Sequence, residues 1–471
     1  MRKIPCALTI AGSDSGGGAG IQADLKTFAA LGVHGMSALT SITAQNTAAV
    51  TAVQDVRPDI VKAQIDAVVE DIGVDAAKTG MLHTIEIIQA VAEEIEKYRF
   101  PTVIDPVMIA KSGAPLLRPD AIETFVKELF PLATVVTPNA TEAETLSGVK
   151  VGTLESAKQA ARKIAKLGPK AVVVKGGHVL SGEKAIDVLY IDDEFRTLEA
   201  KRIETKTTHG TGCSFSAAIA AELAKGKNVF EAVSVAKEFI TKAIMFGLPI
   251  GRGFGPVNPM ANLYNEAEKY QVIKNVKDAV RILEEHPEVE GLIPEVQTNI
   301  VMALSYASSH LDVAAIQGRV VRVERGVKAS SCPEFGASRH VAKTVLAVMK
   351  HDPSIRAGMN IRYSEEIVEI CKKLGLTVSY YDRREEPPEI KRIEGMTTAW
   401  GAEQAIKKVG KVPDVIYHLG DWGKEPLITL LGKTAVEVAN TAVKVAKEYH
   451  ANISDLHLLR RTSQWRKYVY T

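Results

Sequence analysis

Short apolar runs alternate with amphipathic segments along the first half of the chain. Residues 6–12 and 171–177 are apolar, β-branched runs that end in glycine, which is typical of buried strands. Between such runs, residues 19–32 and 58–73 repeat apolar side chains at helical spacing. This alternation predicts βαβ units, a mainly parallel sheet, and ligand binding beyond the carboxyl ends of its strands.

The pattern breaks in the middle of the chain and then resumes. Residues 248–259 are rich in glycine and proline, which marks a domain boundary, and a charged helix is predicted over roughly residues 265–286. Strand-like and helix-like segments follow again, which predicts a second, smaller α/β domain. We therefore expect one domain over residues 1–262, a linker helix over residues 263–289 and a second domain over residues 290–471.

Composition excludes several classes of protein. A chain of 471 residues is too long for one ordinary core, which supports two domains. The 58 Lys and Arg residues nearly balance 56 Asp and Glu, so the net charge of +2 gives no reason to expect nucleic-acid or membrane binding. The four cysteines form no CxxC pair or zinc motif, and no apolar run could span a membrane. We expect a cytoplasmic enzyme that acts on small molecules.

The stretch KTTHGTGCSF, residues 206–215, predicts an anion-binding turn at the start of a helix. Gly210 and Gly212 bracket Thr211, so the backbone can turn tightly and direct N–H groups at a phosphate. Such a turn stabilises charge on a phosphoryl group during transfer, and a plain turn is the alternative. Phosphotransferases acting on an alcohol usually place a carboxylate base next, where this chain has Cys213.

Other strand ends carry residues that suit a metal ion. Asn139 and Glu142 lie three residues apart where a strand gives way to a helix, a spacing that can face hydrated Mg²⁺ or cap the helix. Asp105 ends another strand, either as a metal ligand or as a turn residue before Pro106. The spacing therefore leaves both interpretations open.

Two further stretches suit a nucleotide and a heterocycle. The run KGGH, residues 175–178, ends a strand. Its glycines allow the backbone to lie close to nucleotide phosphates, and the alternative is a plain turn. The glycine-rich residues 11–20 lack the GK[ST] ending of a P-loop. Gln45 offers a planar donor and acceptor for an aromatic ring with nitrogens, or is a surface glutamine.

In their order along the chain, these motifs resemble the ribokinase-like superfamily, in particular hydroxymethylpyrimidine (phosphate) kinase, from about residue 7 to residue 259. The motifs are AGSDSGGGAGIQADLKTF, AQNT, IDPVMIAKSG, TPNATEAE, VVVKGGH and THGTGCSFSAA. The resemblance implies a three-layer α/β/α fold, ATP, Mg²⁺ and two successive phosphorylations of 4-amino-5-hydroxymethyl-2-methylpyrimidine. It also implies a homodimer formed through this domain.

The same resemblance implies roles for individual positions. Related sugar and pyridoxal kinases usually carry Asp at position 213, which argues against the alternative of a pyridoxal-type vitamin kinase. The residues fall into four groups: around the pyrimidine, Gly12, Asp24, Gln45, Met81 and Val107; at the nucleotide, Lys175, Gly176, Gly177, His178 and Thr211; at the metal, Asp105, Asn139 and Glu142; in the catalytic turn, Gly210, Gly212 and Cys213.

A thiol at position 213 has a physical rationale. The first acceptor is an alcohol, whereas the second is a phosphate ester that is already anionic. A carboxylate about 4 Å from that anion would be repelled by roughly 4 kcal/mol at an effective dielectric of 20. We expect Cys213 to be neutral when the phosphate binds. We also expect the helix N-terminus to lower the pKa of the thiol, so that the thiolate can still form. The alternative is a small residue that packs under the turn.

In the second half, basic residues accompany a Ser/Gly loop at a predicted helix start. Arg319 and Lys328 lie in a strand region, and Arg339 and His340 begin the helix, an arrangement suited to pyrophosphate. His340 can act as a donor or acid near neutral pH. The alternative is a solvated strand face with His340 packed under the helix.

Residues from roughly 290 to 465 resemble the thiamine-phosphate synthase domain that is unrelated to the TIM-barrel synthase. The motifs are IQGRVVRV, FGASRH, AGMNIRYS and HLGDWGKEP. The resemblance implies joining of the pyrimidine diphosphate to a thiazole phosphate with loss of pyrophosphate. Arg319, Arg339 and His340 are the candidate site residues, followed by Lys328 and Asn360. The alternative is a module that senses thiamine phosphate without turnover.

Overall fold

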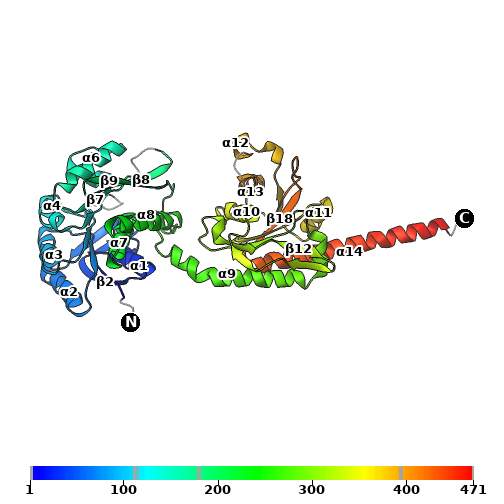
Figure 1. The fold of residues 1–471 in the computed structure, drawn as a ribbon, viewed down its shortest axis with the longest axis horizontal. Coiled ribbons are helices and arrows are strands. Elements are labelled where there is room, and N and C mark those ends of the chain that lie inside the picture. The colour runs from blue at the N-terminus through cyan, green and yellow to red at the C-terminus, as the bar shows by residue number, and fades with distance from the viewer. Residues whose placement is uncertain (1–3, 110–112, 114–115, 178–181, 392–395, 469–471) are drawn as a thin grey trace. The chain divides into compact units, whose positions relative to one another are not determined.

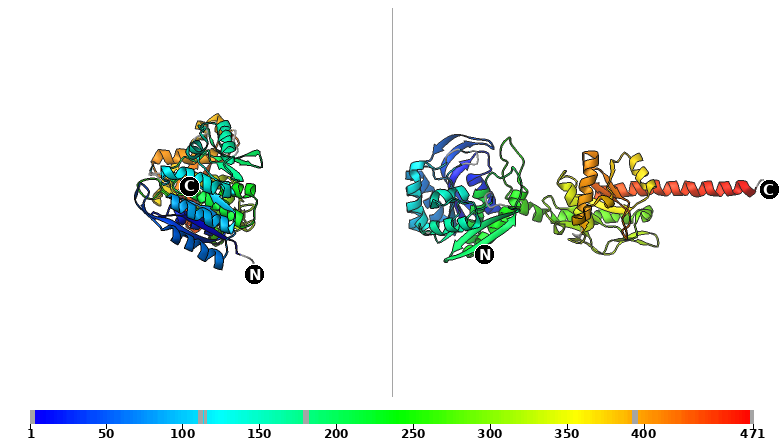
Figure 2. Two further views of the ribbon diagram at one scale, coloured as in Figure 1. Left: turned by 90° about the vertical axis from the view of Figure 1, so that its left-hand side faces the viewer. Right: turned by 90° about the horizontal axis from the view of Figure 1, so that it is seen from above.

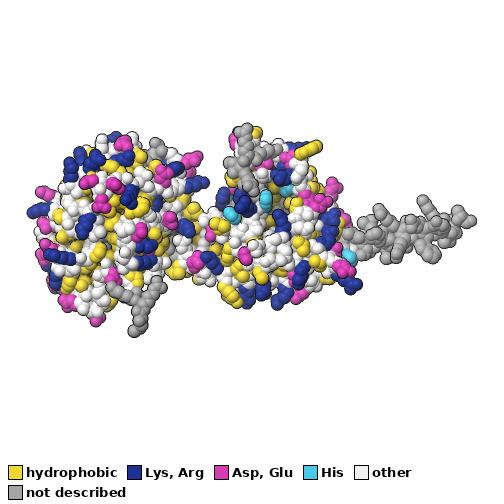
Figure 3. Space-filling model, in the orientation of Figure 1, with side chains coloured by type: hydrophobic (Ala, Val, Ile, Leu, Met, Phe, Trp, Pro, Cys, Tyr) yellow, Lys and Arg dark blue, Asp and Glu magenta, His cyan; other side chains and the backbone are white. Residues whose placement is uncertain are grey.

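The computed structural model describes residues 4–109, 113, 116–177, 182–391 and 396–468 (Figure 1). The chain divides into two compact units, Met1–Leu263 and Tyr264–Thr471. Over the described residues, no helix is both long and apolar enough to cross a membrane. Acidic and basic side chains are interspersed on the visible faces of both units, in keeping with the small net charge (Figure 3).

The first unit is built on one sheet whose described strands run in the order β3-β2-β1-β4-β5-β6-β7-β8-β9. The inner pairs from β2 to β7 are parallel, whereas β3, β8 and β9 pair antiparallel at the two edges. The strands are β1 (Cys6–Asp14), β2 (His34–Gln45), β3 (Val50–Asp55), β4 (Ala76–Thr79), β5 (Thr102–Ile104), β6 (Val135–Val136), β7 (Ala171–Val174), β8 (Lys184–Ile191) and β9 (Glu194–Lys201).

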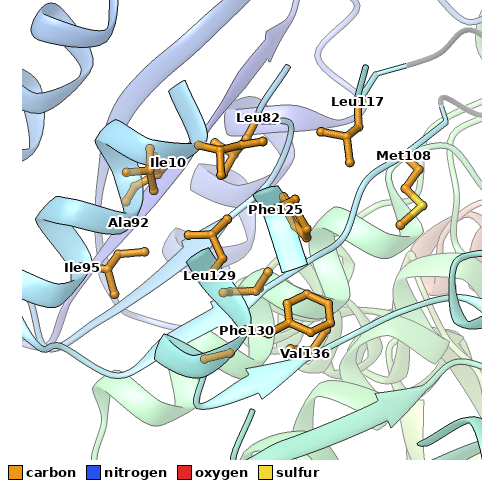
Figure 4. Packing of buried hydrophobic residues seen from close by; sticks show 14 of the residues in the cluster. Ile10, Leu82, Ala92, Ile95, Met108, Leu117, Phe125, Leu129, Phe130 and Val136 are labelled. Atoms are coloured by element: carbon orange, nitrogen blue, oxygen red, sulfur yellow. The ribbon is translucent and has the colours of Figure 1, made fainter. Parts of the chain in front are cut away.

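Helices cover both faces of this sheet (Figures 1 and 2). One face packs on α2 (Pro58–Asp71), α3 (Ile85–Tyr98), α4 (Ile122–Leu129), α5 (Ala140–Ser147) and α6 (Leu154–Ala165), through the apolar cluster drawn in Figure 4. The other face packs on α1 (Gly20–Ala30), α7 (Thr211–Ala224) and α8 (Val229–Met245). This confirms the predicted three-layer α/β/α fold with a mainly parallel sheet.

The second unit has a smaller sheet in the order β14-β11-β10-β15-β18-β17-β16. Its described pairs are antiparallel except for β16 with β17, and β12 (Val320–Val323) and β13 (Gly326–Ala329) form a separate hairpin. The strands of the sheet are β10 (Ile300–Ala303), β11 (Val313–Ile316), β14 (Pro333–Phe335), β15 (Ala357–Arg362), β16 (Val378–Tyr380), β17 (Val415–His418) and β18 (Leu427–Gly432).

Helices also cover both faces of the second sheet. One face packs on α9 (Ala261–Glu284), α11 (Glu365–Lys373) and α14 (Ala435–Tyr468), and the other on α10 (His340–Met349) and α13 (Met396–Val409). A short helix, α12 (Pro388–Lys391), precedes α13. Helix α9 lies in the segment expected to be a linker, yet Val272, Val276 and Leu283 are buried in the core of this unit.

Candidate active site

The turn ahead of α7 adopts a conformation that a side chain would prevent. Gly210 precedes the helix with a φ of 77°, and a Cβ atom there would lie 1.8 Å from the carbonyl oxygen of Gly18. In the described part of the chain, no side chain caps this helix end. The N–H groups of Gly212 and Cys213 lie in the uncapped first turn, where they can bind an anion.

A buried pair of polar side chains, His209 and Asp14, ties this turn to the glycine-rich loop after β1. Nε2 of His209 lies 2.8 Å from Oδ2 of Asp14. The same carboxylate accepts hydrogen bonds from the backbone N–H groups of Gly16, Gly18 and Ala19 at 2.8–3.1 Å. Burial raises the pKa of Asp14, but these hydrogen bonds outweigh it and hold the pKa below its usual range. Neither residue was predicted from the sequence as a site residue.

A second buried pair, of opposite charges, lies below the turn, near Cys213. Lys78 and Asp24 are 2.9 Å apart and have no exposed side-chain surface, and Thr9 also donates to Asp24 at 2.7 Å. Burial raises the pKa of Asp24. Burial lowers the pKa of Lys78, but the combined attraction of Asp24 and neighbouring acidic groups outweighs it and leaves the pKa raised. Asp24 therefore lies in the floor of the site, and its contribution to pyrimidine binding stays a prediction.

The expectation of a lowered thiol pKa is wrong. Burial raises the pKa of Cys213 to about 11. The positive charge of Lys78 lowers this pKa, but the negative charges of Asp24 and Asp105 oppose that effect. The thiol is therefore neutral near neutral pH, although a helix N-terminus by itself favours the thiolate. Lys78 was not predicted, and its signal was a lysine inside the otherwise apolar strand of DAAKTGM.

Asp105 and Lys175 form another buried ion pair at the ends of β5 and β7. Oδ1 of Asp105 lies 3.1 Å from Nζ of Lys175. The carboxylate also accepts hydrogen bonds from Thr137 and Ser216, both at 3.2 Å. Burial lowers the pKa of Lys175, but attraction to Asp105 and neighbouring acidic groups leaves it raised. A Cβ atom on Gly212 would lie 3.4 Å from Nζ of Lys175, so this cation lies beside the α7 turn.

Asn139 and Glu142 cap helix α5, as one of the two interpretations predicted. Oδ1 of Asn139 accepts from the backbone N–H of Glu142 at 3.0 Å, and Oε2 of Glu142 accepts from that of Asn139 at 2.7 Å. Burial raises the pKa of Glu142 to about 7, since the nearby Asp105 opposes the attraction of Lys175. The capping role accounts for one carboxylate oxygen and leaves the metal interpretation open.

The glycines after β7 are held from outside the turn. The N–H of Gly176 donates to Oδ1 of Asp187 at 3.0 Å, and Oδ2 of Asp187 lies 2.7 Å from Nζ of Lys237. Both charged side chains are buried, and they join β8 to α8. The KGG turn is thereby fixed by an ion pair that was not predicted from the sequence.

The other residues assigned to the nucleotide differ in their surroundings. Among the described residues, nothing lies within 4 Å of a Cβ atom built on Gly177, which leaves room for a ligand to approach its backbone. The hydroxyl of Thr211 donates to the carbonyl of Thr208 at 2.7 Å and stabilises the α7 turn. His178 lies outside the described residues.

Several residues assigned to the pyrimidine lie together. Met81 belongs to a small apolar cluster against which Val50 and Val107 pack. A Cβ atom on Gly12 would lie 3.2 Å from Sδ of Met81. Gln45 ends β2 opposite Val50, so its amide lies at the edge of the same cluster.

In the second unit, three candidates have definite partners or conformations. Arg319 is exposed and has a φ of 93°, which is unfavourable for a residue with a side chain. Lys328 pairs with Glu284 of α9 at 3.0 Å. The buried amide of Asn360 accepts from the backbone N–H of Asn299 at 2.8 Å and donates to a backbone carbonyl at 2.9 Å. These contacts give Asn360 and Lys328 structural roles, and their roles in binding stay predictions.

The two remaining candidates, Arg339 and His340, are adjacent at the N-terminus of α10. Both are exposed, and His340 is the first residue of the helix. The carbonyl of His340 accepts from the hydroxyl of Thr398 in α13 at 3.3 Å. An arginine at a helix N-terminus suits a phosphate ligand.

Comparison with known families defines the class of protein. Residues 14–258 match the family model of phosphomethylpyrimidine kinase, and residues 275–444 match that of thiamine-phosphate synthase ThiN. The chain thus joins a ribokinase-like kinase domain to a synthase domain, and both resemblances are confirmed. Because the first match covers more than half of its length, the chain belongs to the phosphomethylpyrimidine kinase family.

Similar curated proteins come from bacteria. The hydroxymethylpyrimidine/phosphomethylpyrimidine kinase of Rhizobium meliloti is 54% identical over 256 residues, which cover 54% of this chain and 96% of that protein. The thiamine biosynthesis bifunctional protein ThiED of Geobacter sulfurreducens is 50% identical over 252 residues, 53% of this chain and 51% of that protein. That match covers about half of ThiED, whereas the two family models cover both units of this chain, which joins a kinase and a synthase domain of thiamine biosynthesis.

Similar solved structures include pyridoxal kinases. An ADP complex of the Bacillus subtilis pyridoxal kinase is 46% identical with a TM-score of 0.51, covering 54% of this chain and 97% of that chain. The Staphylococcus aureus pyridoxal kinase with AMP-PCP and pyridoxal is 41% identical with a TM-score of 0.52, covering 55% and 95%. These structures support the kinase fold, and they make the identity of the acceptor a question for experiment.

Proposed function

We propose that the first unit uses ATP to phosphorylate 4-amino-5-hydroxymethyl-2-methylpyrimidine and then its phosphate. The observation that carries this proposal is the convergence of the uncapped α7 turn, Cys213, Lys78 and Lys175 at the ends of parallel strands. Backbone N–H groups and cations at one point stabilise a transferring phosphoryl group, which is most of what this reaction requires. The apolar cluster around Met81 would hold the ring.

The donor set near Asp105 fits Mg²⁺. Carboxylate and amide oxygens are the ligands this ion prefers, and it usually takes one or two carboxylates with substrate phosphates rather than a full protein cage. Among the described residues, no group of three or more His, Cys, Asp or Glu side chains could hold a metal alone. Asp105, Asn139 and Glu142 would hold the ion, which would neutralise the nucleotide phosphates. Its charge would also oppose the effect of burial, which raises the pKa of Glu142.

The residues of this chain would divide the remaining work. Lys175 would pair with a phosphate oxygen beside the turn, and the N–H groups of Gly212 and Cys213 would bind the transferred group. The neutral thiol of Cys213 would lie beside the acceptor oxygen without repelling a phosphate ester. Asp14 and His209 would keep the glycine-rich loop and the turn in register.

For the second unit we infer condensation of the resulting pyrimidine diphosphate with a thiazole phosphate, releasing pyrophosphate. Arg339 and His340 at the start of α10 support a site for the leaving pyrophosphate, with Arg319 as a further cation. We assign the kinase to residues 1–262 and the synthase to residues 290–471, together with helix α9. A cytoplasmic location and a homodimer formed through the kinase domain complete the proposal.

Acceptor comparison tests the kinase. We expect kcat/KM for hydroxymethylpyrimidine and its phosphate to exceed that for pyridoxal by at least tenfold. The similarity to solved pyridoxal kinases favours a second candidate function, which the reverse ranking would support.

A coupled assay tests the synthase. The full chain is given pyrimidine diphosphate and thiazole phosphate, and thiamine phosphate and pyrophosphate are measured. Equal amounts of the two products support the synthase. Tight binding of thiamine phosphate without formation of either product would support the sensing module instead.

A further inference from the structure

A cluster of buried polar side chains in the second unit has no role in the site described above. Tyr381 follows β16, and His418 is the last residue of β17, so both lie at neighbouring ends of this parallel pair. Their ring centroids are 5.2 Å apart. Trp400 of α13 meets Tyr381 edge-on at 6.1 Å, which closes one side of the cluster.

Two charged side chains in the same region each have a buried atom without a partner, and Arg383 as a whole is only partly buried. Nε of Arg383 and Oε1 of Glu386 have no hydrogen-bond partner among the described residues, and Glu386 is only 5% exposed. Both groups lie near enough to Tyr381 to affect its pKa, which burial raises. A buried charged group normally has a partner, because leaving it unpaired opposes folding. A buried donor atom and a buried acceptor atom that both lie near Tyr381 and have no partner therefore indicate a ligand that supplies both partners.

The cluster lies one helical turn from the proposed pyrophosphate site. Thr398 of α13 contacts the carbonyl of His340, and Gly401, three residues on, faces Tyr381. Residues three apart share a face of a helix, so His340 and Tyr381 contact the same face of α13. A Cβ atom on Gly401 would lie 2.4 Å from Cζ of Tyr381, so the ring packs directly on the helix backbone.

His418 contributes a donor to this cluster. Its Nδ1 accepts a hydrogen bond from the backbone N–H of Gly420 at 3.1 Å, so the ring hydrogen of the neutral imidazole is on Nε2. Burial, with the Arg383 guanidinium nearby, lowers the pKa of His418 to about 4, which keeps the ring neutral. The cluster thus combines a carboxylate acceptor, an N–H donor and aromatic faces.

We propose that Tyr381, Arg383, Glu386 and His418 form the subsite that holds the aminopyrimidine ring of the diphosphate substrate. This proposal rests on the proposed synthase reaction and names where its larger heterocycle binds. The exocyclic amine donates to Oε1 of Glu386, and a ring nitrogen accepts from Nε2 of His418. The ring lies against the aromatic side chains, and Nε of Arg383 donates to the diphosphate on the side of α10.

The chain provides matched controls for this test. Glu385 and Arg384 neighbour Glu386 and Arg383, carry the same charges and are exposed. In the full-length protein, we expect Glu386→Gln to raise KM for the pyrimidine diphosphate at least tenfold and to leave KM for the thiazole phosphate within twofold. Glu385→Gln and Arg384→Gln should change neither value more than twofold. An unchanged KM for the pyrimidine diphosphate, or a rise confined to the thiazole phosphate, would overturn the proposal.

A binding measurement separates this subsite from the synthase activity. The three tryptophans, Trp400, Trp422 and Trp465, all belong to the second unit, so a chain with Trp422→Phe and Trp465→Phe reports only from beside Tyr381. Titration with thiamine phosphate, which carries the same aminopyrimidine, should change this fluorescence, and Glu386→Gln should weaken binding at least tenfold.

Binding without turnover would contradict the synthase but support the subsite. Equal binding by the parent chain and Glu386→Gln would contradict the subsite even if turnover occurs. If Glu386→Gln does not fold by circular dichroism, His418→Gln replaces it with the same expected results.

Discussion

Nε2 of His209 lies 2.8 Å from Oδ2 of Asp14, and this contact joins residues 195 positions apart. Because a carboxylate with a lowered pKa only accepts, the imidazole donates through Nε2. The glycine-rich loop after β1 and the turn before α7 are therefore held together by one side-chain pair.

We predict that His209→Gln lowers kcat/KM of both kinase steps by roughly ten- to hundredfold, since a small displacement of a phosphate-binding turn is costly. Asp14→Asn should act similarly, and the double variant should be little worse than either single one. Steady-state kinetics measure the effect, with exposed His34→Gln as the control. Additive losses would show that the two residues act independently.

Substitutions of Cys213 should separate the two acceptors. We expect Cys213→Asp to lose the second phosphorylation at least tenfold more than the first, because a fixed carboxylate repels the phosphate ester. Cys213→Ala should lower the first step more than the second. Initial rates with each acceptor measure the ratio, and Cys332→Ala, an exposed cysteine of the second unit, is the control. Equal damage to both steps by both variants would contradict a role that depends on acceptor charge.

Lys237 should affect ATP binding although it lies outside the phosphate turn. Lys237→Met leaves the buried Asp187 without its cation, which we expect to destabilise the first unit by about 3–5 kcal/mol. Release of the Gly176 N–H should also raise KM for ATP severalfold, with a smaller change in kcat. Urea unfolding and kinetics give the two quantities. Lys242→Met, exposed on the same helix, should change neither.

His418 should make the second unit less stable in mild acid. Its pKa is about 4 when folded and 6.5 in the reference state, so between these values the unfolded chain binds more protons. The contribution of neutral His418 to the free energy of unfolding is fully present above pH 6.5. It should fall by up to roughly 3 kcal/mol as the pH drops to 4. Urea titrations followed by tryptophan fluorescence measure this loss. His418→Gln should flatten the dependence in this window, and an unchanged slope would contradict the assignment.

The strands and helices were predictable because their apolar periodicity is local. The segments around α1, α2 and α7 appear where their patterns indicate. For Asn139 and Glu142, the spacing predicted a cap and a metal site equally, and geometry shows the cap because both hydrogen bonds are present.

The ion pairs below the site were not predictable in the same way. Lys78 meets Asp24 across 54 positions, and Lys237 meets Asp187 across 50. Neither pairing has a local signal, since the partners meet only when the sheet and its helices pack. The pKa of Cys213 was mispredicted for the same reason, because its burial and the carboxylates around it depend on the tertiary fold.

The burial of α9 has a practical consequence for dividing the protein. A fragment that starts at residue 290 would lack Val272, Val276 and Leu283, and would expose the apolar face that these side chains cover. A gene fission that preserves this core must therefore cut ahead of Val272, and the boundary between the two units, after Leu263, meets that requirement.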